Sequence, residues 1–201
     1  MKLTTSIGPN PGVVTLYIAA KGISVPSESI DIMASENRQP AYLAKNPFGG
    51  TPLLELDNGG VLSESIAICE YLEELHPSPA LIGTTLEERA ETRMWVRRID
   101  LGYVQPMVMG FRGAEGLPLF KNRMRCVPEG AATLKAVAGD GLAMIDTHLT
   151  GRHYICGNRM TLADLLLQAF VEFGPSVGQP PDPELTNIAA WHARIAAPRA
   201  A

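Results

Sequence analysis

The first part of the chain alternates short apolar runs with segments whose apolar residues recur at helical spacing. Residues 2–7 form an extended run, and residues 13–23 have the spacing of a helix that Gly22 would end. Residues 24–32 alternate well enough for a second strand, and Pro26 predicts that this strand begins at the edge of a sheet. The chain therefore opens with a strand, a helix and a second strand.

The same alternation continues through the next segments. A short helical stretch at 39–45 precedes an apolar strand at 53–56. The Gly-Gly pair at 59–60 predicts a tight turn into a brief returning strand at 61–62, and a helix at 64–75 follows. This order predicts an α/β domain, in which a mixed four-stranded sheet is flanked by helices on both faces.

The remainder of the chain has helical periodicity only. Residues 78–85 contain a proline and a glycine without periodicity, which is typical of a linker. We therefore expect two domains, an α/β domain at 1–77 and an all-α domain at 86–201. Pro106 predicts a kink in the first helix of the second domain. The expected helices are 86–110, 128–149, 162–173 and 185–197.

Composition and charge exclude several classes of protein. With 46% hydrophobic and 19% charged residues, the chain can bury enough apolar surface to fold without disulfides or metals. The net charge is −4, and the densest basic run, Arg93, Arg97 and Arg98, stands among acidic residues. We therefore expect no nucleic acid partner. No stretch approaches the roughly 18 apolar residues of a membrane span, so we expect no membrane partner either.

The cysteines point to a reducing compartment. Cys69, Cys126 and Cys156 are odd in number, lie far apart and form no CxxC pair. This spacing argues against a metal site and against a dithiol redox site. The absence of a secretory leader pattern at the N-terminus agrees with a cytoplasmic protein.

Thr51-Pro52, directly before the strand at 53–56, is the first candidate binding element. A proline at a strand entrance cannot donate to the sheet, and a cis bond there would turn the backbone N–H and C=O of Thr51 toward an extended peptide ligand. The alternative is an ordinary trans proline in a turn, which base rates for X-Pro bonds favour.

Two further candidates lie at predicted helix starts. Ser63 is a natural N-cap, and the N–H groups behind it form an anion site in which Ser65 could hold a carboxylate and Glu64 an ammonium. In the first loop, Ser6 and Asn10 could donate to a thiolate or oxyanion. The alternative in both places is helix or loop capping alone. The spacing of Thr161 and Asp164 predicts a capping box with a folding role; both residues lie just ahead of LLLQAF.

Together these pieces resemble the glutathione transferase family, in which a thioredoxin-like domain precedes an all-helical one. The resemblance runs through AKNPFGGTPLLELDNGGVLSESIAICEYLEELHP, ERAETRMWVRRIDLG, GNRMTLADLLL and AAWHARIAA. The PNP loop, the RAE…MW…RR helix and the short length are most similar to an atypical branch. This branch includes the second fungal type and its bacterial relatives.

The resemblance implies a set of glutathione-binding residues. It implies a cis bond at Pro52, backbone pairing of Thr51 with the cysteinyl part of glutathione, and binding of the γ-glutamyl end by Glu64 and Ser65. Arg38 resembles the basic residue that often meets the glycyl carboxylate. Glutathione would then be a co-substrate, with no metal involved.

The sequence departs from the family pattern around the sulfur. The first loop contains no Tyr or Cys, so we expect Asn10 or Ser6 to stabilise the glutathione thiolate at the first helix. A mixed disulfide through a loop cysteine is excluded. Gly50 stands where the family often has Lys or Gln, so the glycyl end would be held less firmly.

The helical domain would supply the second substrate pocket. A row of Met and aromatic residues at helical spacing is usually part of a protein core. The family has its pocket at this position, so we weigh a pocket role equally with a core role. The family also implies a homodimer, and Phe48 is placed like the aromatic key that some classes insert into the partner subunit. The expected pocket residues are Tyr103, Met107, Phe111 and Arg112.

The resulting hypothesis is a glutathione transferase that conjugates reduced glutathione to a small hydrophobic electrophile between the two domains, as in detoxification. One alternative is a glutathione-dependent disulfide or peroxide reductase, which the hydroxyl and amide groups of the first loop favour. Another is a non-catalytic scaffold or regulatory protein with the same fold. The unusual first loop fits the scaffold, whereas the Glu64-Ser65 pair argues against it.

Overall fold

The computed structural model describes residues 1–197, in two compact units that divide between Leu81 and Ile82. The division falls inside the segment 78–85 whose composition is typical of a linker. Each unit has its own buried core, and each is taken by itself below.

The first unit is built on a mixed four-stranded sheet of order β2-β1-β3-β4. β1 pairs with β2 in parallel and with β3 antiparallel, and β4 returns antiparallel to β3. This confirms the predicted sheet, including the position of β2 at its edge. The strands are β1 (Lys2–Thr5), β2 (Ser27–Ser29), β3 (Leu53–Glu55) and β4 (Val61–Ser63).

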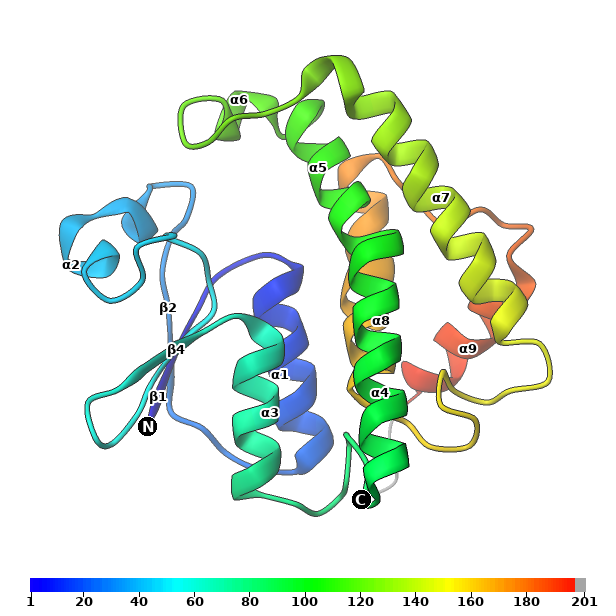
Figure 1. Ribbon diagram of the computed structural model, residues 1–201. Helices are drawn as coiled ribbons and strands as arrows, with labels where there is room; N and C mark the ends of the chain where they lie inside the picture. Colours follow the sequence, from blue (N-terminus) through cyan, green and yellow to red (C-terminus); the bar gives the residue numbers. More distant parts are fainter. Residues whose placement is uncertain (198–201) are drawn as a thin grey trace. The chain divides into compact units, whose positions relative to one another are not determined.

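Helices cover both faces of this sheet. α1 and α3 lie side by side on one side of the strands, and α2 lies on the other (Figure 1). α1 ends as predicted at Gly22, whose φ of 64° is a left-handed conformation that favours glycine. The helices of this unit are α1 (Pro9–Lys21), α2 (Pro40–Leu43) and α3 (Ser65–Leu75), with a 3₁₀ turn at Glu36–Arg38.

A buried ion pair joins the ends of α1 and α3. The Lys21 side chain is fully buried, forms an ion pair with Glu73, and donates to the carbonyl oxygens of His76 and Pro79, both at 2.6 Å. The Tyr17 hydroxyl also donates to Glu73, and its burial raises its pKa. Every donor of the ammonium thus has an acceptor, which offsets the cost of removing the charge from water. This ion pair ties the segment after α3 to the core of the first unit.

The second unit is all-helical and is built around α8. Residues 162–171 of α8 are all buried, so this helix is apolar on every side and forms the centre of the unit. Short 3₁₀ turns at Pro128–Gly130 and Gly174–Val177 join its longer elements. The helices are α4 (Leu86–Ile99), α5 (Gln105–Gly113), α6 (Leu117–Phe120), α7 (Ala131–His148), α8 (Leu162–Phe173) and α9 (Thr186–Ile195).

The predicted long helix with a kink at Pro106 is wrong in detail. A π-helical segment, Asp100–Val104, separates α4 from α5, and α5 continues to Gly113. Pro106 has no N–H, and its ring would clash with the carbonyl four residues earlier in a regular helix. The wider π turn just ahead of it accommodates both features. A Cβ on Gly141 of α7 would lie 2.0 Å from the Gly102 carbonyl oxygen, so the two backbones are in direct contact there.

The predicted capping box at the start of α8 is confirmed. The backbone N–H of Thr161 donates to Asp164 Oδ2 at 2.8 Å, and the reciprocal bond to the Thr161 side chain is present. Asp164 Oδ1 also accepts from the Ile155 N–H at 2.9 Å and from Trp191 Nε1 at 3.0 Å. Burial raises the pKa of this carboxyl. One side chain therefore links α8, α9 and the preceding loop.

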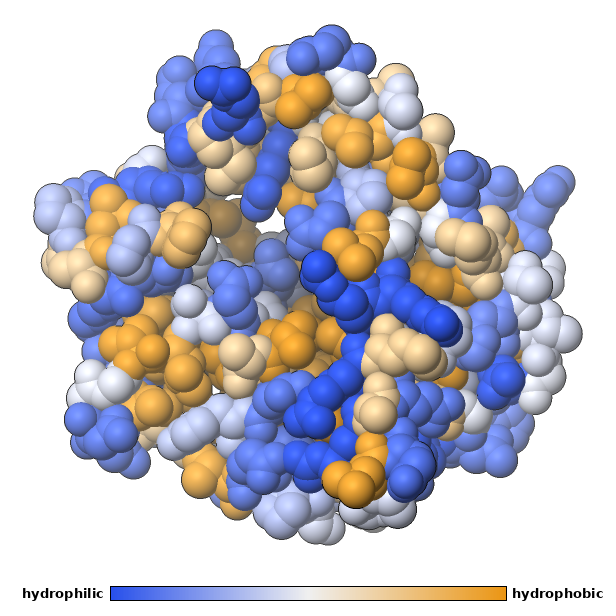
Figure 2. Space-filling view, in the orientation of Figure 1, coloured by the Kyte–Doolittle hydropathy of each residue, from blue (hydrophilic) through white to orange (hydrophobic). Residues whose placement is uncertain are grey.

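The basic run on α4 is balanced by its neighbours. Arg97 pairs with Asp100 at 2.9 Å, and the Arg98 guanidinium lies 4.9 Å from the centre of the Trp95 ring. Hydrophilic side chains gather over this helix in Figure 2. No helix in the described part of the chain is long and apolar enough to cross a membrane.

Candidate functional site

The first loop and the entrance of β3 are joined by their side chains. Ser6 Oγ lies 2.6 Å from Thr51 Oγ1 and also donates to the Ile7 carbonyl oxygen at 3.1 Å. The Thr51–Pro52 peptide bond is cis, as the resemblance implied. Within residues 1–197, no hydrogen bond joins the N–H or C=O of Thr51 to another backbone group, so both groups can pair with an extended peptide.

The start of α1 offers few backbone donors to an anion. α1 begins at Pro9 after Gly8, whose φ is 122°, and no side chain caps it. Pro9 and Pro11 have no N–H, and the Gly12 N–H bonds to the Gly8 carbonyl. Among the first three residues of the helix only Asn10 therefore carries an N–H. The side chain of Asn10 is exposed and the hydroxyl of Ser6 is half-buried, and neither caps the helix.

The start of α3 meets the start of α1 through a serine. The buried Ser65 hydroxyl donates to the Asn10 carbonyl oxygen at 2.8 Å. The prediction that Ser63 caps this helix is wrong, because Ser63 ends β4 and Glu64 occupies the cap position. No side chain caps α3, so its first N–H groups remain available to a carboxylate.

Glu64 adopts a strained backbone conformation at this point. Its φ is 71°, a region that costs a residue other than glycine about 1 to 3 kcal/mol. Its side chain is exposed, so packing does not compensate for the strain. Strain of this kind is typical of positions selected for contact with a ligand.

Three residues that sequence reasoning missed hold the segment before Thr51. The Tyr42 hydroxyl and Asn46 Nδ2 both donate to the Gly50 carbonyl oxygen, at 2.6 and 2.9 Å. Asn37 Nδ2 donates to the Gly49 carbonyl oxygen at 2.7 Å. All three are buried and bond within the segment 37–50, but no sequence motif signals these bonds.

Arg38 lies beside the same segment. Its Nη1 donates to the Phe48 carbonyl oxygen at 3.3 Å, and the residue is half-buried. A Cβ on Gly49 would lie 2.8 Å from Arg38 Nη1, so the glycine makes room for the guanidinium. Phe48 itself is 86% exposed.

The residues expected to meet the second substrate divide into two pairs. Tyr103 and Met107 are buried within the second unit, and the Tyr103 hydroxyl donates to the Phe170 carbonyl oxygen at 3.4 Å. Burial also raises the pKa of Tyr103. Phe111 and Arg112 are half-buried.

An aromatic cluster surrounds the half-buried pair. The Phe111 ring meets Phe120 and Phe173 edge-on, with ring centres 5.9 and 5.7 Å apart. The Arg112 guanidinium lies 5.2 Å from the centre of the Phe120 ring. Within residues 1–197, no group of three or more His, Cys, Asp or Glu side chains could hold a metal ion.

Models of known protein families match both parts of the chain. The model of the glutathione S-transferase N-terminal domain matches residues 8–75, and that of the C-terminal domain matches residues 132–198. Glutathione S-transferase 2 of Saccharomyces cerevisiae is 31% identical over 198 residues, which cover 95% of this chain and 83% of the yeast protein. The chain belongs to the glutathione S-transferase family.

Solved structures place the chain near one branch of the glutathione S-transferases. A glutathione S-transferase domain-containing protein of Marinobacter aquaeolei VT8 has a TM-score of 0.92 at 31% identity, and the match covers 98% of each chain. Gtt2 of Saccharomyces cerevisiae has a TM-score of 0.90 at 30% identity, covering 97% of this chain and 95% of the yeast chain. The predicted likeness to the second fungal type and its bacterial relatives is confirmed.

Relatives with other names match as well. A maleylacetoacetate isomerase of Pseudomonas aeruginosa is 32% identical over 77% of this chain and 71% of the isomerase. Elongation factor 1-gamma of Prunus avium is 32% identical over 80% of this chain but only 36% of that protein. Membership of the family therefore does not by itself decide between transfer, isomerisation and a role without catalysis.

Proposed function

We propose that this protein conjugates reduced glutathione to a small hydrophobic electrophile. One observation carries the proposal: hydrogen bonds between Ser6 and Thr51 and between Ser65 and Asn10 gather candidate residues from three separate segments. Helix capping alone would not require these segments to meet, and neither α1 nor α3 has a side-chain cap. A peptide ligand with a thiol and a carboxylate matches the groups collected there.

Glutathione would lie along these segments in an extended conformation. Its cysteinyl backbone would pair with the free N–H and C=O of Thr51. Its γ-glutamyl carboxylate would accept from the uncapped N–H groups of α3 at Ser65, and its ammonium would meet the exposed Glu64 carboxylate. Arg38 is the candidate partner of the glycyl carboxylate.

The thiolate would be stabilised by the first loop. Lowering a thiol pKa from about 9 to about 7 requires roughly 3 kcal/mol of preferential thiolate stabilisation. The Asn10 N–H, the Asn10 side-chain amide and the Ser6 hydroxyl are three donors, and each contributes about 1 kcal/mol or more toward a charged acceptor. The thiolate would then attack an electrophilic carbon and expel the leaving group as an anion.

The electrophile would contact the aromatic cluster at the end of α5. Phe111 and Arg112 are half-buried and can contact a ligand, whereas Tyr103 and Met107 are buried and would set the position of α5 from behind. Aromatic edges and a guanidinium suit a flat electrophile that carries partial negative charge.

Titration calorimetry tests glutathione binding directly. Reduced glutathione should bind with a micromolar to low-millimolar Kd, and Ser65→Ala should weaken binding, because the residue orders the start of α3 against α1. Ser24→Ala, an exposed serine in the same unit, serves as the control. No binding to the wild type at several millimolar glutathione would contradict the proposal. Rates with an aryl halide, compared with those for a disulfide and a hydroperoxide, then separate transfer from reduction.

A scaffold without catalysis is the second candidate. Pro9 and Pro11 leave the start of α1 with few donors for a thiolate, and elongation factor 1-gamma of Prunus avium shows that relatives carry other names. A scaffold would bind no glutathione at concentrations that saturate a transferase. The calorimetric titration therefore distinguishes the two candidates.

A further inference from the structure

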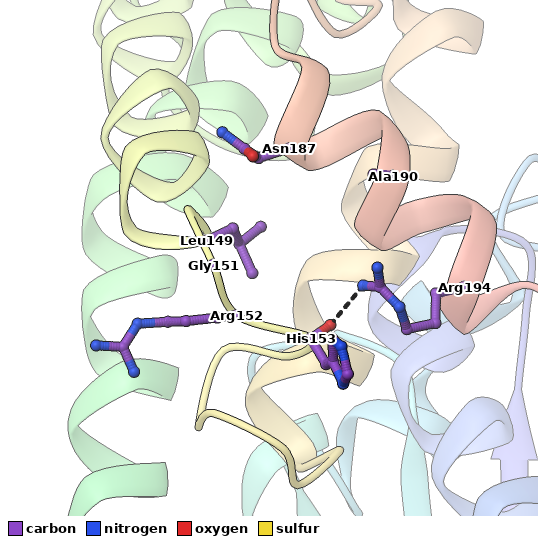
Figure 3. A pocket seen from close by; sticks show the side chains of 7 residues that line it. All are labelled: Leu149, Gly151, Arg152, His153, Asn187, Ala190 and Arg194. Carbon is purple, nitrogen blue, oxygen red and sulfur yellow. Dashed lines mark hydrogen bonds between the residues drawn. The ribbon is translucent and has the colours of Figure 1, made fainter.

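A pocket of about 280 Å³ opens in the second unit between the end of α7 and α9 (Figure 3). Leu149, Arg152 and His153 line it from the end of α7 and the loop that follows. Asn187, Ala190 and Arg194 line it from one face of α9. All of these residues belong to the second unit, and none of them is among the residues proposed to bind glutathione.

The charged groups of this pocket are all basic. Arg152 and Arg194 carry guanidinium groups, and no lining residue is acidic. Asp146 lies behind Asn187, and both of its oxygens are occupied: Oδ2 accepts from Asn187 Nδ2 at 3.0 Å, and Oδ1 from the Ile188 N–H at 2.8 Å. This carboxylate is thereby directed to the first turn of α9. The pocket thus offers cationic groups without an acidic lining residue to neutralise them.

Arg194 is held in position to receive an anion. Its Nη1 donates to the His153 carbonyl oxygen at 2.7 Å, the bond drawn in Figure 3. A guanidinium has five N–H donors, so four remain beyond this anchoring bond. Because the side chain is already ordered, little rotamer entropy is lost when a ligand binds.

Arg152 adds a second guanidinium at the rim of the pocket. It is exposed and extends away from Arg194 in Figure 3. Its side chain makes no hydrogen bond or ion pair within residues 1–197, so it is free to turn toward a ligand.

The other residues that line the pocket indicate which further groups a ligand would carry. Ala190 is exposed and provides a short apolar surface, whereas Leu149, another lining residue, is buried. Asn187 uses its Nδ2 on Asp146, which leaves its Oδ1 as an acceptor for a ligand hydroxyl. The volume of about 280 Å³ is just below the range for drug-sized ligands, which starts at roughly 300 Å³, so the ligand would be small.

We propose that this pocket binds a small organic anion, a hydroxylated carboxylate or phosphate, with Arg194 as the anchor and Arg152 as a second, mobile contact. The proposal does not depend on glutathione chemistry. The shared chemistry is an oxyanion on a short polar chain, and malate and inorganic phosphate are the probes that separate its carboxylate and phosphate forms.

Amide NMR of the full chain, titrated at physiological salt, tests the proposal. Saturable shifts are expected at Gly151, His153 and Ala190 with malate, with phosphate, or with both. Arg194→Gln and Arg152→Gln should each weaken that binding roughly tenfold, the size expected for a charge-assisted hydrogen bond. Arg125→Gln, an exposed arginine outside the pocket, is the matched control and should leave the affinity unchanged.

Two results would overturn the proposal. One is the absence of saturable shifts at these amides with either probe. The other is equal affinity in the wild type and both pocket variants. Arg152→Gln removes no hydrogen bond or ion pair within the described residues, so a loss of affinity in that variant is attributed to the ligand contact and not to the fold. If Ser65→Ala abolished anion binding while Arg194→Gln kept it, the anion would be bound in the first unit and the proposal would be wrong.

Discussion

The hydroxyl oxygens of Ser6 and Thr51 lie 2.6 Å apart, and the direction of the hydrogen bond between them can be deduced. The single Ser6 proton points to the Ile7 carbonyl, an oxygen that can only accept, so Thr51 is the donor to Ser6. A bound thiolate is a charged acceptor, and it would attract the Ser6 proton away from that carbonyl. Thr51 would then support Ser6 as a positioning residue.

Removal of the Thr51 hydroxyl should therefore raise the pKa of enzyme-bound glutathione. We expect Thr51→Val to raise it by about one unit, because one hydrogen bond contributes about 1 kcal/mol. Thr51→Ser should restore the wild-type value. The measurement is the ultraviolet absorbance of the thiolate as a function of pH. Equal pKa values in Val and Ser variants would show that the hydroxyl only stabilises the loop.

Pro9 and Pro11 leave one backbone N–H at the start of α1, so the proposed thiolate stabilisation would also need the side chains of Asn10 and Ser6. Asn10→Ala should raise the pKa of bound glutathione, and Ser6→Ala should do the same. The double variant should raise it further. Asn158→Ala, an exposed asparagine in the second unit, is the control. If both single variants and the double variant leave the pKa unmoved, the loop has a structural role only.

Replacement of Glu64 by glycine should stabilise the fold and weaken glutathione binding. Because its φ is 71°, Glu64→Gly should raise the free energy of unfolding by about 1 kcal/mol. The same change should weaken glutathione binding roughly tenfold through loss of the carboxylate. Ser35→Gly, with a φ of 64°, is a matched control that should stabilise the protein without changing affinity. Urea unfolding and calorimetry measure both effects, and an unchanged glutathione affinity in Glu64→Gly would remove Glu64 from the binding site.

The buried ion pair should dominate the stability of the first unit. Lys21→Met should lower the free energy of unfolding by about 3 to 5 kcal/mol, because Glu73 would be left buried without its cation. The double variant Lys21→Met, Glu73→Leu should recover part of this loss, since no unpaired charge remains. Urea unfolding is the measurement. A double variant less stable than Lys21→Met alone would show that the ion pair itself, and not the unpaired charge, determines the effect.

Phe48 is the candidate contact of the proposed homodimer. It is 86% exposed, which is unusual for a large aromatic side chain. If it inserts into a partner subunit, Phe48→Ser should shift the sedimentation coefficient toward that of a monomer. An unchanged dimer would count against this contact but not against dimerisation.

Local signals predicted much of the fold. Gly22 marked the end of α1, Pro26 marked an edge strand, and the Thr161–Asp164 spacing marked the start of α8. Each of these depends on residues close in sequence, where propensity and capping decide the outcome. Ser63 was misassigned because pairing with β3 extends β4 through it.

Contacts between distant segments could not be predicted in the same way. The hydrogen bond from Asn46 to the Gly50 carbonyl joins residues only four apart in the sequence. Its relevance to the candidate site depends on Thr51, which follows Gly50. The bond from Ser65 to Asn10 spans 55 residues, and neither residue type implies the other. Sequence reasoning found Ser65 and Asn10 singly, as capping or binding candidates, and only the fold shows that they are in contact.

The backbone contact at Gly141 limits where the second unit can change. A side chain on Gly141 would overlap the Gly102 carbonyl, so this crossing of α7 over the π-helical segment is closed to substitution. The half-buried residues at the far end of α5 and in α6 have no such restriction. A library of variants designed to widen the range of the proposed substrates would therefore keep Gly141 and vary Phe111, Arg112 and Phe120. All of its members would keep the same crossing of α7 over the π-helical segment.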